Sequence, residues 1–130
     1  MAALARDVLE ADGIRTRLVS LPCFEAFERQ VDDYRESILP RAISKRVTVE
    51  AGVTLGWDRY AGPDGAMIGI DHFGASAPGA TVLEHFGFTA EHVAEIGRRV
   101  VREGLRGRIP SPDPGHQPAG LGLGQPIGRD

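Results

Sequence analysis

Apolar residues recur at helical spacing near both ends of the chain. Residues 2–11 predict an amphipathic helix, because one face collects the apolar side chains Leu4, Ala5, Val8 and Leu9. Residues 89–103 predict another, with an apolar stripe of Val93, Ile96 and Val100, and with Thr89 as its N-cap. Residues 80–86 form a shorter helical stretch that Gly87 ends, leaving Phe88 placed for the apolar contact of a Schellman cap.

Between these helices, short apolar runs indicate strands. They cover residues 14–19, 46–50 and 66–71, and Gly69 in the last run suggests a close backbone approach. Further helical stretches run through Phe24 and Phe27, and from about Asp33 to Pro40. The alternation predicts an α/β domain in three layers with a mostly parallel sheet. Because the chain opens directly on a helix, a first strand of that sheet is expected to be missing.

The composition changes near the C-terminus. Residues 105–130 are rich in glycine and proline and contain no aromatic residue. Such a segment cannot bury enough apolar surface to offset the entropy lost on ordering, so it predicts a disordered or surface-draped tail. The folded domain is then expected to span residues 1–104.

Charge and cysteine content narrow the class of protein. A net charge of −3, from 15 Lys and Arg against 18 Asp and Glu, excludes a strongly basic nucleic-acid binder. The arginines at 98, 99, 102, 106 and 108 could contact phosphates, but acidic neighbours favour an exposed helix face. One cysteine allows no internal disulfide, and no apolar run is long enough to span a membrane, so a cytoplasmic location is expected.

Eight blocks of sequence carry a family resemblance. They are ADGI at 11–14, VSLP at 19–22, YRESILP at 34–40, RVTVEAG at 46–52, GWDRY at 56–60, GAMIGID at 65–71, FGASAP at 73–78 and FGFT at 86–89. In this order they resemble the C-terminal domain of transketolases over about residues 3–103. The resemblance implies a part of an enzyme that transfers two-carbon ketol units between sugar phosphates.

The same resemblance implies a division of labour within such an enzyme. In the family, two other domains hold thiamine diphosphate and a divalent metal, Mg or Ca, through a Gly-Asp-Gly motif with a downstream Asn, and supply the activating glutamate. The sequence has none of these motifs, so no catalytic, cofactor-binding or metal residue carries over, and this chain alone is predicted inactive. Its expected role is packing and assembly, with the other transketolase domains or a split-enzyme subunit as partners, and as a homo-oligomer. A free-standing interaction module that pairs with a partner's strand is the alternative.

Two sets of residues could carry chemistry of their own. Cys23 precedes a helical stretch, which can activate a thiol, although Glu25 nearby opposes thiolate formation. Asp71 and His72 end one strand and Glu50 ends another, so together they could hold a metal or perform acid–base chemistry. The competing interpretation is that Asp71 caps the loop at residues 73–78 by accepting backbone N–H bonds, while His72 faces solvent or a partner domain.

Three aromatic residues are candidates for an interface. Trp57 and Tyr60 lie between two predicted strands beside glycines, and Phe73 follows the strand at 66–71. Within a complete transketolase they are expected to pack against another domain or subunit. In this chain alone, exposed aromatic surface at Trp57 and Tyr60 predicts self-association.

Overall fold

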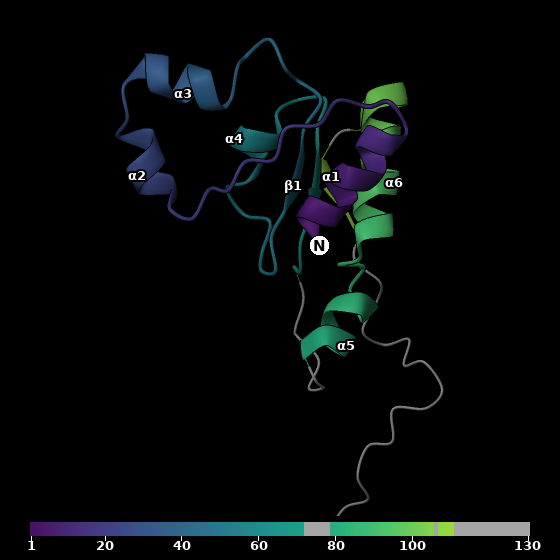
Figure 1. Ribbon diagram of the computed structural model, residues 1–130. Coiled ribbons are helices and arrows are strands. Elements are labelled where there is room, and N and C mark those ends of the chain that lie inside the picture. Colours follow the sequence, from purple (N-terminus) through teal and green to yellow (C-terminus); the bar gives the residue numbers. More distant parts are fainter. Residues whose placement is uncertain (72–78, 106, 111–130) are drawn as a thin grey trace, which may run out of the picture.

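Three short parallel strands form the sheet of this domain. The computed structural model describes residues 1–71, 79–105 and 107–110, and Figure 1 shows the strands between two groups of helices. The strands β1 (Val47–Val49), β2 (Ala66–Ile68) and β3 (Gly107–Ile109) lie side by side in that order. Their pairing is parallel throughout, as the sequence predicts.

One face of the sheet is covered by the two long helices. These are α1 (Ala2–Ala11) and α6 (Ala90–Glu103), which pack against each other, while α6 also contacts β1 and β2. Most of the apolar stripes predicted from the sequence form the core here, because Ala5 and Leu9 meet Val93, Ile96 and Val100, whereas Leu4 is 60% exposed. Gly97 lets the helices approach closely, since an added Cβ would lie 2.9 Å from Leu9 Cδ1.

Shorter helices lie on the other side of the strands (Figure 1). The helix α4 (Asp58–Ala61) contacts β1 and β2, and α2 (Phe24–Glu28) and α3 (Asp32–Ile38) lie beyond it. Because the strands alternate their side chains, Thr48 and Met67 face away from the core that contains Val47 and Ile68. Helix, sheet and helix therefore form the expected three layers.

The end of α5 (Gly79–His85) follows the capping pattern predicted from the sequence. The Gly87 amide donates to the Glu84 carbonyl and the Phe88 amide donates to the Leu83 carbonyl, as in a Schellman motif. Gly87 has a positive φ of 81°, and Phe88 is buried. The N-cap of α6 is also confirmed, because the Thr89 hydroxyl accepts a hydrogen bond from the His92 amide.

The strand predicted at residues 14–19 is wrong. This segment is extended but pairs with no strand among the described residues. Its fixed contacts are of other kinds: the Ile14 amide donates to the Leu9 carbonyl, and Arg17 donates to the Ser37 carbonyl at 2.9 Å. Alternating residues can adopt an extended shape, but a strand also needs a neighbouring backbone.

The start of the glycine- and proline-rich segment differs from the sequence expectation. The sequence places residues 105–130 in a tail, whereas the structure pairs β3 with β2 and packs Leu105 and Ile109 against the core. Residues 107–109 therefore belong with the folded part. Residues 111–130, on which the rest of that expectation falls, lie outside the described residues.

Candidate functional site

Asp71 holds together the loop after β1 and the end of the sheet. Its Oδ1 accepts a hydrogen bond from the Thr54 amide at 2.7 Å, and its Oδ2 accepts one from the Thr54 hydroxyl at 2.8 Å. Arg108 of β3 forms an ion pair with the same carboxylate at 3.3 Å. We call this arrangement the Asp71 clamp. The capping considered for Asp71 concerned the loop at residues 73–78, which lies outside the described residues, whereas the amide partner observed here is Thr54.

The clamp displays two apolar side chains on the surface. Val53 and Leu55 flank Thr54 and are 59% and 86% exposed. Gly69 reinforces the arrangement, because an added Cβ there would lie 2.6 Å from Thr54 Cγ2 and 2.9 Å from the Gly52 carbonyl oxygen. The close approach predicted at Gly69 is thus confirmed. We call the segment 53–55 the apolar loop.

Glu50 lies beside the loop that follows β1. The Glu50 side chain lies against Gly52, with Oε1 3.5 Å from the position of an added Cβ. In residues 1–71, 79–105 and 107–110 no group of three or more His, Cys, Asp or Glu side chains could hold a metal ion. His72 and Phe73 lie outside the described residues.

The Cys23 thiol is exposed and forms no disulfide among the described residues. Its Sγ donates a hydrogen bond to Glu25 Oε2 at 3.4 Å, an arrangement that uses the protonated thiol. A backbone hydrogen bond, followed by this contact with Cys23, lowers the pKa of Glu25. The Cys23 sulfur therefore has the Glu25 carboxylate as its hydrogen-bond partner.

Trp57 and Tyr60 pack inside the chain, against α2. Phe24 lies 4.8 Å from Trp57 and 4.9 Å from Tyr60 between ring centroids, and Phe27 lies 6.1 Å from Tyr60. The expectation that Tyr60 is exposed is wrong, since its exposed fraction is 6%. The feature of the sequence that could have predicted this packing is the pair Phe24 and Phe27, which supplies a second aromatic surface for Trp57 and Tyr60 to contact.

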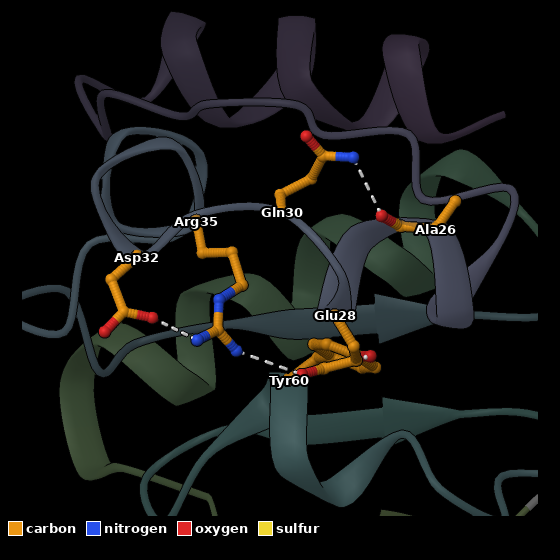
Figure 2. A network of polar contacts seen from close by, with 6 residues as sticks. All are labelled: Ala26, Glu28, Gln30, Asp32, Arg35 and Tyr60. Carbon is orange, nitrogen blue, oxygen red and sulfur yellow. Dashed lines mark hydrogen bonds and ion pairs between the residues drawn. The ribbon is translucent and has the colours of Figure 1, made fainter.

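A polar network joins this aromatic cluster to α3 (Figure 2). The Tyr60 hydroxyl donates to Glu28 Oε1 at 2.7 Å, and Arg35 Nη1 donates to Glu28 Oε2 at 3.1 Å. Arg35 also binds Asp32, and this guanidinium lowers the pKa of the Asp32 carboxyl. Burial raises the pKa of Tyr60 to about 12, and the hydrogen bond to Glu28 adds to that shift. Nothing in the spacing of these residues pointed to the network.

Three of the C-terminal arginines form ion pairs within the domain. Arg98 donates to Asp12, the C-cap of α1, at 2.6 Å and pairs with Glu95. Arg102 pairs with Glu103, and Arg108 pairs with Asp71. These contacts favour the interpretation of an exposed helix face that carries balanced charge. No helix in the described part of the chain is long and apolar enough to cross a membrane.

The arrangement defines a class of protein: an α/β domain with a parallel sheet, whose clustered polar groups serve its own loops. A family model described as the transketolase-like TK C-terminal domain matches residues 1–89. The chain belongs to this transketolase C-terminal domain family.

Individual transketolases also match this chain in sequence. The transketolase of Aquifex aeolicus is 48% identical over 90 residues, which are 69% of this chain and 13% of that protein. Transketolase 7 of Craterostigma plantagineum is 46% identical over 100 residues, 77% of this chain and 15% of that protein. The chain therefore matches about one seventh of the length of these relatives.

The fold agrees as well. A crystal structure of a transketolase variant from Pichia stipitis superposes with a TM-score of 0.70 at 36% identity, covering 77% of this chain and 14% of that one. The α/β fold expected from the resemblance is thus confirmed.

Proposed function

We propose that this chain serves as the C-terminal domain of a transketolase, supplying docking surface and no catalytic group. The observation that carries the proposal is the apolar loop, which the Asp71 clamp holds in an exposed position. Leu55, which is 86% exposed, contributes hydrophobic stabilisation only when a partner covers it. Because relatives continue for most of their length beyond the matched region, we assign the remaining transketolase domains as that partner.

The ketol transfer itself is assigned to those other domains. Transketolases in general use thiamine diphosphate with a divalent metal, and the side chains described here do not fit that group. Asp71 is bound by Thr54 and Arg108, and Glu28 by Tyr60 and Arg35, so neither carboxylate is open to a metal ion. The contribution of this chain is to hold the reacting parts in register through apolar contact.

A domain exchange tests the proposal directly. The matched residues of the Aquifex aeolicus transketolase are replaced by those of this chain, and ketol transfer and oligomeric state are measured. We expect a folded enzyme that transfers ketol units and forms a homo-oligomer, while the 130-residue chain alone transfers none. Activity of the chain alone, or a folded but inactive exchange enzyme, would contradict the proposal.

A matched pair of variants locates the docking surface. In the exchange enzyme, Leu55→Ser is expected to lower thermal stability and promote dissociation of the domain, because it removes apolar area from the interface. Leu4→Ser is the control, since Leu4 is also well exposed, at 60%, but belongs to α1 and not to the apolar loop. Equal effects of the two substitutions would show that the apolar loop is not part of the interface.

A free-standing interaction module is the second candidate. It is favoured by β1, whose outer edge pairs with no strand among the described residues, and by the extended segment 14–19. An open edge can receive a partner's strand through backbone hydrogen bonds. This function predicts a stable complex with a chain that is not a transketolase, and identification of the captured chain from native lysate separates the two candidates.

We assign the chain to a reducing compartment, the cytoplasm. The exposed thiol of Cys23 supports this assignment, because such a thiol persists where disulfides are reduced. Relatives include a chloroplastic transketolase of Zea mays, so imaging of a tagged chain in its native cell is the measurement that checks it.

A further inference from the structure

A cavity opens on the side of the domain away from α1 and α6. Its volume is about 380 Å³, and its walls come from α2, α3, the segment 39–46 and α4. The size falls within the range of small-molecule pockets. Four arginines and two glutamates line it: Arg35, Arg41, Arg46, Arg59, Glu28 and Glu36.

The two glutamates are already occupied by partners in the chain. Glu28 binds Arg35 and the Tyr60 hydroxyl, as Figure 2 shows. Glu36 pairs with Arg41, with 3.6 Å between the charged atoms, and also accepts the Arg41 amide at 2.9 Å. Within the described residues, Arg46 and Arg59 form no ion pair with a carboxylate. The cavity therefore carries two positive charges without counterions from its own walls.

Arg46 is held in place without being neutralised. Its Nη1 donates to the Tyr60 carbonyl at 3.1 Å, and its Nη2 donates to the Pro40 carbonyl at 2.7 Å. These bonds fix the guanidinium while leaving further N–H donors. Arg59 lies across the Tyr60 ring, 6.0 Å from its centroid. A fixed guanidinium loses little further entropy when an anion binds, so the geometry favours an oxyanion.

We propose that this cavity binds the phosphate group of a small organic molecule. Two uncompensated guanidinium groups match the double negative charge of a phosphate monoester better than the single charge of a carboxylate. The organic part is inferred from the apolar walls of the same cavity, which include Phe27, Leu39 and Ile43. Ile43 is 50% exposed, so a carbon skeleton can cover it.

The test is a titration of the full 130-residue chain with ligand at low ionic strength. Binding is measured by calorimetry and by changes in the NMR shifts of backbone amides. Inorganic phosphate, phenyl phosphate and phenol are compared as probes. We expect the two phosphates to bind with millimolar dissociation constants, with phenyl phosphate several-fold tighter, and to shift amides of the cavity. Equal affinity for inorganic phosphate and phenyl phosphate would overturn the inference that the ligand has an organic group, and would identify free phosphate as the ligand.

A pair of charge variants keeps the assignment falsifiable. Arg59→Gln removes one uncompensated charge from an exposed residue and is expected to weaken phosphate binding about tenfold. Arg102→Gln removes the same charge from α6, where Arg102 is 65% exposed and outside the cavity, and is expected to leave binding unchanged. Equal losses in both variants, or no amide shifts at the cavity, would overturn the proposal. These measurements use the chain alone, so they are independent of the domain exchange.

Discussion

Replacement of Gly65 by alanine is expected to be among the most damaging small changes in this domain. An added Cβ would lie 2.2 Å from the Ala61 carbonyl oxygen and 2.6 Å from the Arg46 carbonyl oxygen. Both atoms belong to backbone, at the end of α4 and just before β1, so neither can rotate away. The Ala66 amide donates to the same Arg46 carbonyl at 2.9 Å, so moving it disturbs the pairing of β1 and β2.

The size of the effect follows from the required movement. Backbone must shift by roughly 1 Å, and insertion of a methyl group into a packed site costs about 1–3 kcal/mol, with rigid neighbours at the upper end. We expect Gly65→Ala to lose about 2–3 kcal/mol of unfolding free energy and to lower the melting temperature by roughly 10–20 °C.

The assay is urea unfolding followed by circular dichroism and by the fluorescence of Trp57, the single tryptophan. Gly79→Ala is the matched control, because no atom lies within 4 Å of its added Cβ and its φ is not in the left-handed region. It is expected to change stability by less than about 1 kcal/mol. An unchanged urea midpoint for Gly65→Ala would refute the reasoning about its contacts.

Two further predictions concern single hydrogen bonds. The chain has two tyrosines, so in Tyr34→Phe the remaining phenol reports Tyr60, and its absorbance transition is expected at about pH 12. Because the folded pKa exceeds the unfolded value of about 10, stability should fall as the pH rises from 10 to 12, and Tyr60→Phe should remove that slope. Thr89→Ala removes the acceptor of the His92 amide and is expected to cost about 1 kcal/mol in urea unfolding, whereas Thr89→Ser should retain most of it.

Long periodic segments of the sequence determined the most accurate predictions. The stripe of α6 and the buried positions of α1 other than Leu4 were predicted correctly, because a helix makes its own backbone hydrogen bonds and burial then follows from spacing. Strands depend on a neighbour that local pattern does not reveal. Residues 14–19 alternate well but lack a neighbour in the described structure, while β3 lies among glycines and prolines and was missed because β2 provides its pairing.

The candidate site was predictable only in its residue types. Asp71 was identified as a loop-capping carboxylate, but its partner Thr54 lies 17 residues earlier, and no local rule links them. Tyr60 was predicted to be exposed in this chain, but it is buried, and its burial depends on α2, which comes before it in the chain. The arginine cavity was invisible for the same reason, since Arg35, Arg46 and Arg59 come from three separate segments.

The pairing of the first long helix with the last has a consequence during synthesis. Leu9 packs against Gly97, and Asp12 bonds with Arg98 from 86 positions away. At about 5–20 residues per second, a ribosome takes roughly 5–20 s to make the intervening chain. Throughout that interval the apolar face of α1 lacks its main native partner, α6, so it is available to chaperones and to neighbouring nascent chains. The domain can complete its core only after α6 and then β3 have been synthesised.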